Sequence, residues 1–236
     1  MRPRARAGVT LMEMLIAVTL FALLSVAMLY AFRIGLMAYS NTQTRLMDNR
    51  RVAGAQRILE AELQGMIPVV AQCGATAENG GTKAAFFQGE PATMRLVSTY
   101  SLQEASRGMA QILEIFTAPG ENGQGERLLV NEIPYTGPLT AGRLCTGSGH
   151  YLPVGATEKS FVLADKLAYC RFTYLTVPLD IVPVPIWGPV FTGKTWPRAV
   201  RIEMAPLQAD PSRLQPITVT ALIRVHRNPE VPYVDQ

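Results

Sequence analysis

Proline is missing from a long stretch near the N-terminus. The chain of 236 residues contains 17 prolines, yet none lies between Pro3 and Pro68. A proline inside a helix removes a backbone hydrogen bond and clashes with the preceding turn. Its absence here permits one long helix, which we expect at residues 10–66.

Charge is also scarce. Charged residues make up 17% of the chain and hydrophobic residues 48%, a composition that excludes a disordered protein. Residues 9–32 contain one charged side chain, Glu13. A helix of this length extends roughly 36 Å, enough to cross a hydrocarbon core of about 30 Å. We therefore expect residues 9–32 to lie in a membrane, and the lack of a second such run argues against a multi-span protein.

Cysteine and histidine are too few for the usual metal and catalytic arrangements. The three cysteines form no C-x-x-C pair and there are two histidines, which does not support a zinc site. Cys145 and His150 are a weak candidate for a nucleophile and its base, and we expect no catalytic residue, metal or cofactor. Outside the cytoplasm one disulfide can form. Cys73 and Cys145 are the favoured pair because both are expected in loops, whereas Cys170 is expected in the core.

The positive charge is concentrated at the start of the chain. The formal net charge is +4, and Arg2, Arg4 and Arg6 account for three of the 22 basic residues. Without them 19 basic residues face 18 acidic ones, which does not indicate nucleic-acid binding. Basic residues directly before an apolar span keep that end in the cytoplasm. The sequence thus predicts a cytoplasmic N-terminus.

Residues 8–17 read Gly-Val-Thr-Leu-Met-Glu-Met-Leu-Ile-Ala. A cleaved secretory signal has a shorter apolar run and a small-residue cleavage site, and a plain anchor leaves Glu13 unexplained. The segment resembles the prepilin signature of type IV pilins and type II secretion pseudopilins, although Val9 replaces the common Phe. The resemblance implies that residues 1–8 are a leader, cut after Gly8 by a prepilin peptidase that also N-methylates Val9.

In that reading Glu13 is the fifth residue of the mature chain, one helical turn from the new amine. A charged carboxylate in an apolar span is unfavourable by about 2.5–3.5 kcal/mol on insertion scales. In a filament it can neutralise the terminal amine of a neighbouring subunit. We therefore assign Glu13 to filament assembly.

The second half of the expected helix, residues 33–66, carries charged side chains and an apolar stripe. The stripe recurs at three- and four-residue spacing and is expected to pack on a sheet: Val52, Ala55, Leu59, Leu63 and Met66.

From residue 67 to 236 the apolar pattern changes to period two, which is typical of antiparallel strands with one buried face. Expected strands lie at residues 94–102, 111–116, 128–133, 160–163, 170–175, 200–204 and 217–225. Loops are expected at residues 74–91, 118–125, 136–157 and 178–197, and the long ones are candidates for subunit contacts. The sequence thus predicts an α+β fold, a long N-terminal helix packed on an antiparallel sheet domain.

Two later segments sharpen the resemblance. Residues 196–202 and 161–175 are similar to consecutive late strands of J-type minor pseudopilins. This resemblance implies a minor subunit of the type II secretion pseudopilus that helps to start filament assembly at the tip. Its implied partners are other minor pseudopilins, the major pseudopilin, the peptidase and inner-membrane lipid, with the globular domain in the periplasm. A minor pilin of a type IV pilus or DNA-uptake system is the alternative.

One motif suggests different chemistry. Residues 188–195 satisfy the phosphate-binding pattern G-x-x-x-x-G-K-S/T, with Lys194 as its lysine. That pattern needs a buried strand before it and a helix after it, whereas proline-rich residues precede it and a strand pattern follows. We expect a solvated loop and no bound nucleotide, with a membrane-tethered nucleotide-binding protein as a distant alternative. Glu121 and Glu126 are too few to indicate calcium.

Overall fold

The computed structural model describes residues 10–75, 80–102, 106–146, 150–177, 184–191, 196–207 and 216–223, apart from the side chains of residues 41, 43–53, 106, 107 and 122. The chain divides into two compact units, residues 1–48 and 49–236. Gly8, Val9, the leader arginines and Lys194 lie outside the described residues.

The long helix expected from the lack of proline is present as α1 (Leu11–Gln64). It ends two residues before the predicted position. The Gly65 amide still donates to the Ala61 carbonyl, but Met66 pairs with Ser98 as an isolated β-bridge. A Cβ at position 65 would lie 2.7 Å from the Ser98 hydroxyl and 3.2 Å from the Ala61 carbonyl oxygen, so any larger residue would have to displace the Ser98 side chain.

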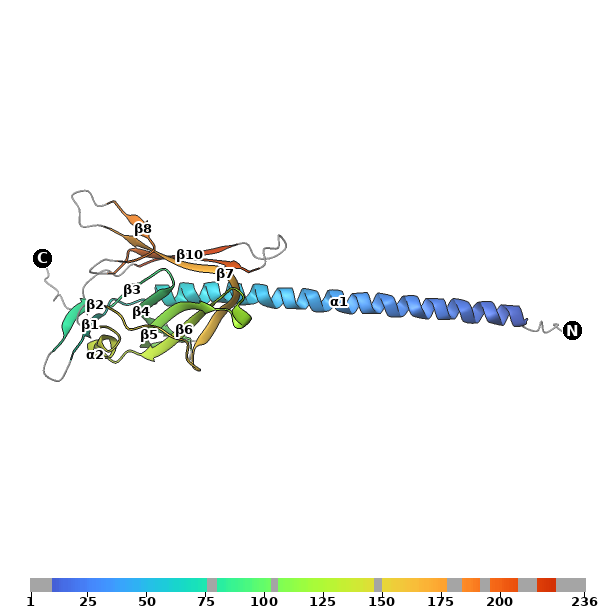
Figure 1. Ribbon diagram of the computed structural model, residues 1–236, viewed down its shortest axis with the longest axis horizontal. Helices are drawn as coiled ribbons and strands as arrows, with labels where there is room; N and C mark the ends of the chain where they lie inside the picture. The colour runs from blue at the N-terminus through green and yellow to red at the C-terminus, as the bar shows by residue number, and fades with distance from the viewer. Residues whose placement is uncertain are drawn as a thin grey trace, which may run out of the picture. The chain divides into compact units, whose positions relative to one another are not determined.

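The described residues of the second unit form an eight-stranded antiparallel sheet and a separate two-stranded one (Figure 1). The larger sheet has the order β10 (Ile217–Leu222), β9 (Ala199–Pro206), β7 (Phe161–Thr176), β6 (Glu126–Pro134), β5 (Ser106–Pro119), β4 (Thr93–Ser101) and β3 (Gln88–Gly89), and β8 (Ile186–Gly188) also pairs with β7. The smaller sheet pairs β1 (Val70–Cys73) with β2 (Thr82–Ala85). The predicted α+β arrangement of a long helix and an antiparallel sheet is confirmed.

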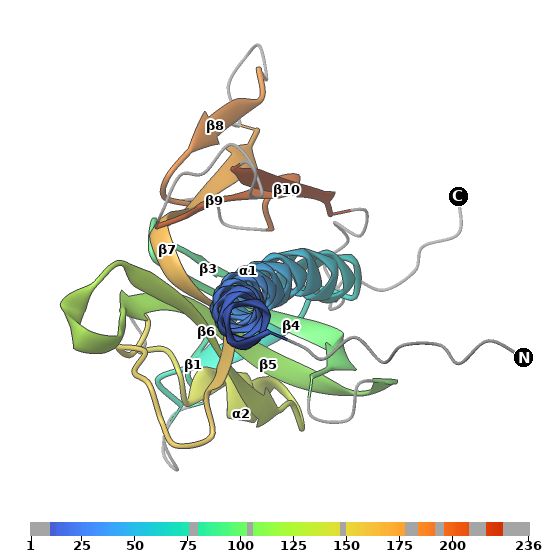
Figure 2. The ribbon, with the colours of Figure 1, turned by 90° about the vertical axis from the view of Figure 1, so that its right-hand side faces the viewer.

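Strand β7 joins the two halves of the large sheet. Its first part pairs with β6 and its second part with β9, and the register shifts where these partners change. Lys166 at this point has a φ of 52°, a left-handed conformation that suits a bulge. The sheet therefore curves, with β9 and β10 on one side of the final turns of α1 and β4 to β6 on the other (Figure 2).

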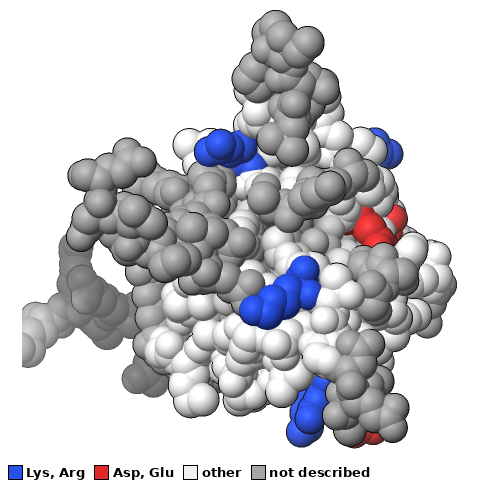
Figure 3. Space-filling model, turned by 90° about the vertical axis from the view of Figure 1, so that its left-hand side faces the viewer, with Lys and Arg blue, Asp and Glu red and all other residues white. Residues whose placement is uncertain are grey.

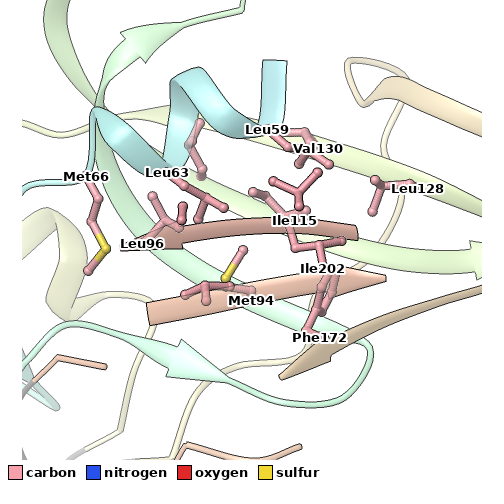
Figure 4. Packing of buried hydrophobic residues seen from close by; sticks show 14 of the residues in the cluster. Leu59, Leu63, Met66, Met94, Leu96, Ile115, Leu128, Val130, Phe172 and Ile202 are labelled. Carbon is pink, nitrogen blue, oxygen red and sulfur yellow. The ribbon is translucent and has the colours of Figure 1, made fainter. Parts of the chain in front are cut away.

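The main core lies inside this curve. Ala55, Leu59 and Leu63 from α1 are at most 1% exposed and pack with inward side chains of both halves of the sheet (Figure 4). The predicted apolar stripe is therefore buried at these positions and at Met66, and the side chain of Val52 lies outside the described residues. The apolar face of the sheet that packs on this stripe is formed by alternate residues of the strands, since alternate strand residues point to the same side.

A second, smaller core covers the opposite face of β4 and β5. It brings together β1, the short helix α2 (Pro138–Gly142) and side chains such as Val97 and Ile112. A Cβ on Gly142 would lie 2.1 Å from the Gln72 carbonyl oxygen, so glycine is needed for this close packing of α2 on β1. This half of the sheet is buried on both faces.

Several boundaries differ from the sequence-based expectations. The expected loop at residues 74–91 contains β2 and β3. The loop expected at residues 136–157 contains α2, and the one expected at residues 178–197 contains β8. These elements have two to five residues, too short to produce a readable period. The strands expected at residues 160–163 and 170–175 are one strand, β7, and the strand expected to reach residue 225 ends at Leu222.

Candidate functional site

The start of α1 is set by a short capping pattern. The Glu13 amide donates to the Thr10 hydroxyl oxygen at 3.3 Å, and the Met14 amide donates to the Thr10 carbonyl at 3.2 Å. The Thr10 side chain thus caps the first turn of α1, as the first residue of a T-x-x-E pattern. The sequence analysis missed the role of Thr10, although the pattern before an apolar run is its usual signal.

The apolar part of α1, Leu11–Ser40, is long and apolar enough to cross a membrane, and the structure buries none of it in its most apolar window. The Thr and Ser hydroxyl groups within the helix bond to its own carbonyls. Thr19 and Ser25 donate to the carbonyls of Ile16 and Phe21 at 2.9 and 2.8 Å. Internal pairing is what a low-dielectric environment requires of polar groups. This segment is therefore compatible with membrane anchoring or with burial among neighbouring helices.

Glu13 is the acidic residue of this segment, and Arg33 is its basic one. Within the described residues, its carboxylate makes no hydrogen bond or ion pair. It lies in the first turn of α1, where the helix dipole favours a negative charge by a fraction of a kcal/mol. That is less than the unfavourable insertion of a carboxylate in lipid, so a further positive partner is required to stabilise it there.

The cysteines take different roles. Cys73 of β1 and Cys145, which follows α2, form a disulfide with a Cα–Cα distance of 5.0 Å, the pair favoured in the sequence analysis. Cys145 therefore has no thiol to act as a nucleophile with His150. Cys170 is a free, buried cysteine on β7, and burial raises the pKa of its thiol to about 12. It is a core residue without reactive character.

Glu62 is the unusual ionisable group of the domain. It is fully buried on α1, and neither of its carboxyl oxygens makes a well-aligned hydrogen bond. Burial raises its pKa to about 8, the Ser98 hydroxyl partly offsets this, and the charge of Glu132 adds to it. Glu62 is therefore protonated in the folded protein at neutral pH.

Other buried polar side chains form a satisfied network beside β4 to β6. Arg95 donates to Glu114 at 2.8 Å and to Gln88 at 2.6 Å, and Asn131 donates to the second oxygen of Glu114 at 2.9 Å. Asn131 also donates to the carbonyl of Gly155 at 3.0 Å. The network ties the segment after α2 to the sheet, and its carboxylate has no unoccupied oxygen for catalysis.

No group of three or more metal-ligating side chains occurs in the described part of the chain. A surface depression of about 350 Å³ is lined by two carboxylates and one arginine, and Arg127 there lies 3.7 Å from Glu121. Glu126 accepts a hydrogen bond from the Cys170 amide at 3.0 Å. On the face drawn in Figure 3, the described Lys and Arg side chains form separate groups among uncharged residues.

The phosphate-binding pattern lacks its required context where it is described. Gly188 ends β8, a three-residue strand that pairs antiparallel with the end of β7. Residues 196–198 lead into strand β9 without a helix. Residues 192–195 lie outside the described residues. A phosphate loop instead follows a buried parallel strand and opens a helix.

Comparison with known proteins identifies the N-terminal segment. Residues 3–29 match a family profile described as the prokaryotic N-terminal methylation motif. A search of curated proteins finds no match to the chain. The chain therefore carries a type IV prepilin-like methylation motif, followed by an apolar helix and an antiparallel sheet domain in a pilin-like arrangement.

Proposed function

We propose that this protein is a minor pseudopilin, a structural subunit of the type II secretion pseudopilus. The observation that carries the proposal is the methylation motif at residues 3–29, continuous with the apolar helix Leu11–Ser40. Prepilin peptidase cuts after Gly8 and methylates Val9. The apolar helix then passes from the inner membrane into a filament core, which is the environment its exposed apolar side chains need.

The proposed orientation places the leader in the cytoplasm and the globular domain in the periplasm. Arg2, Arg4 and Arg6 directly precede the apolar segment, which favours a cytoplasmic N-terminus. The Cys73–Cys145 disulfide supports an oxidising compartment for the domain. Both observations agree on a single-pass inner-membrane protein.

The finer assignment, a J-type subunit of a tip complex, rests on residues 161–175 and 196–202. These segments form most of β7 and the start of β9, and they pair directly where Phe172–Leu175 lies opposite Ala199–Ile202. The proposed partners are other minor pseudopilins and the major pseudopilin, with the subunit itself catalysing nothing. A minor pilin of a type IV pilus or DNA-uptake system shares the same N-terminal motif.

The assembly role is tested with Glu13→Gln, which removes the charge and keeps the side-chain shape. We expect the variant to be inserted and cleaved, yet to co-purify with partner subunits at about a tenth of the normal yield, because the new amine loses its counter-charge. Met14→Leu is the matched control on the next residue and is expected to assemble normally. Mass spectrometry of the mature N-terminus and quantitative co-purification provide the two readouts.

Equal co-purification of Glu13→Gln and Met14→Leu would remove the charge-pairing argument, and a mature chain beginning at Met1 would remove the processing argument. Deletion of the gene separates the two filament types. Loss of protein secretion with intact pili supports the pseudopilus. Loss of pili or DNA uptake with intact secretion supports the pilus alternative.

A further inference from the structure

The outer face of β7, β9 and β10 differs from the outer face of β4 and β5. The second core covers β4 and β5, whereas Thr218, Thr220 and Leu222 of β10 are exposed, Leu222 by 64%. On β9 the inward residues Val200 and Ile202 are buried, so Arg201 between them points outward. This half of the sheet thus presents a strand face to its surroundings.

A row of three residues crosses this face. Thr220 of β10 is directly opposite Arg201 of β9, which is directly opposite Thr173 of β7. Trp187 of β8 lies beside them, because it pairs with Leu175. We call Thr173, Trp187, Arg201 and Thr220 the Arg201 face.

The Arg201 guanidinium stacks on the Trp187 ring, but among the described residues no acidic side chain pairs with its charge. Its guanidinium carbon lies 4.1 Å from the centre of the Trp187 ring, a close cation–π stack. Within the described residues it makes no hydrogen bond or ion pair, and the buried Thr173 hydroxyl has no hydrogen-bond partner. Stacking covers the flat side of a guanidinium and leaves its in-plane N–H groups directed at whatever approaches. The arrangement is pre-organised for a planar acceptor such as a carboxylate.

The surrounding charges are positive in excess. Arg171 on β7 is exposed and lies 5.1 Å from the centre of the Tyr169 ring. Arg198, just before β9, is exposed, but it has the same strand parity as the inward residues Val200 and Ile202 and is therefore not counted on this face.

Glu203 on β9 is directly opposite Arg171 and is the counter-charge on this face. Asp165 and Lys166, the other charged residues of β7, lie in its first part, where β7 pairs with β6. Trp, Tyr and Arg are the residue types that contribute most to protein interfaces.

The number of charges decides the class of partner. Proteins that bind nucleic acid commonly contact about 6–10 phosphates, and anionic lipid surfaces attract clusters of about 4–8 basic residues. Two arginines on this face, one of which is directly opposite Glu203, are too few for either. These arginines suit a protein partner that brings one or two carboxylates within an otherwise uncharged contact surface. The exposed Leu222 would lie at the edge of that contact.

We propose that the Arg201 face docks an acidic segment of a partner protein, with the Arg201 guanidinium binding a partner carboxylate against the Trp187 ring. The proposal goes beyond the function proposed above, because it concerns the globular domain and does not depend on cleavage after Gly8. Thr220, which is exposed, supplies a hydroxyl donor beside the same carboxylate.

The test uses the full chain in its own cells, with the photo-crosslinker benzoylphenylalanine at position 222, which is exposed and borders the Arg201 face without belonging to it. We expect a discrete adduct whose cross-linked partner peptide contains Asp or Glu. Adding Arg201→Glu should lower its yield about tenfold, and so should Trp187→Ala, which leaves the charge but removes the platform. Arg143→Glu, at the exposed end of α2 on the covered half of the sheet, is the matched charge control and should leave the yield unchanged. Replacing the partner acid by Arg should restore the adduct of the Arg201→Glu chain.

Three results would overturn the proposal. These are the absence of an adduct, an adduct insensitive to Arg201→Glu, and an adduct with lipid, nucleic acid or a second copy of this chain. Each variant must show the Cys73–Cys145 disulfide on non-reducing gels and the normal mature N-terminus. Failure of N-terminal processing would therefore be recognised separately from failure of docking.

Discussion

At the residue scale, the least typical group is the Glu62 carboxyl. It is fully buried on the helix that organises the core, and its pKa is raised from 4.5 to about 8, chiefly by burial. Between these two pH values the folded protein keeps a proton that the unfolded chain releases. The unfolded state then binds fewer protons, so the free energy of unfolding falls as pH rises through this window.

Glu62→Gln is therefore expected to reduce this pH dependence. Gln is neutral at every pH, so the variant should be more stable than the parent chain at pH 9, by about 3–5 kcal/mol, the free energy that corresponds to the raised pKa of the Glu62 carboxyl. Below pH 4.5 the gain should disappear. Urea unfolding of the full chain in detergent at pH 4, 7 and 9 measures the effect.

Glu60→Gln provides the control two residues away. Glu60 is partly exposed and accepts a hydrogen bond from Gln56 at 2.9 Å, so its substitution should leave the slope of stability against pH unchanged. If the free energy of unfolding had the same slope against pH in the parent chain and in Glu62→Gln, Glu62 would be ionised in the folded state.

At the element scale, the final turns of α1 serve as the centre around which the sheet curves. Leu59 is completely buried in the main core. Leu59→Ala should lower the free energy of unfolding by about 2–5 kcal/mol, because it removes buried apolar surface and leaves a cavity. Gln64→Ala, at the exposed last residue of the helix, should change it by less than about 0.5 kcal/mol. If Leu59→Ala and Gln64→Ala changed the free energy of unfolding equally, Leu59 would not be part of the core.

The second element-scale prediction concerns the disulfide that links β1 to the residue after α2. The two cysteines are 72 residues apart, and a loop of this length corresponds to about 4 kcal/mol of stabilisation in the chain-entropy account. The pair Cys73→Ser and Cys145→Ser should lose about 2–4 kcal/mol and no longer change gel mobility on reduction. The Cys170→Ala variant should still change its gel mobility on reduction. If this variant showed no mobility change, Cys170 would take part in the disulfide.

At the scale of the whole molecule, orientation in the membrane links the leader to the disulfide. If the three leader arginines retain the N-terminus in the cytoplasm, their replacement by Ser should increase the fraction of chains that insert the wrong way. Such chains keep the domain in a reducing compartment. We expect a several-fold rise in chains without the disulfide, measured on non-reducing gels with protease access to spheroplasts.

Arg143→Ser, in the globular domain, is the control for charge alone and should leave the disulfide fraction unchanged. An unchanged fraction in the leader variant would show that these arginines do not set the orientation. The fraction of chains without the disulfide is also measured at low and at high expression. A fraction that rises only at high expression reflects saturation of the oxidising machinery, and not a changed membrane orientation.

The helix and the main strands were readable from the sequence because their signals are local. A proline-free stretch with one charged residue between positions 9 and 32 specifies a long apolar helix, and period-two alternation specifies β9, β10 and the second half of β7. Short elements such as β8 and α2 escaped because two to five residues give no period, and their stability comes from neighbours distant in sequence. The capping role of Thr10 was readable from the T-x-x-E pattern and was overlooked.

The chain's own order of residues determined that an apolar helix with Glu13 near its start precedes an antiparallel domain, since hydrophobic spacing acts over one or two turns. Only the tertiary structure decided that the sheet bends at Lys166, that Glu62 loses its solvent and that Trp187 stacks on Arg201. Each of these depends on strand register, which is set by packing between segments far apart in the chain.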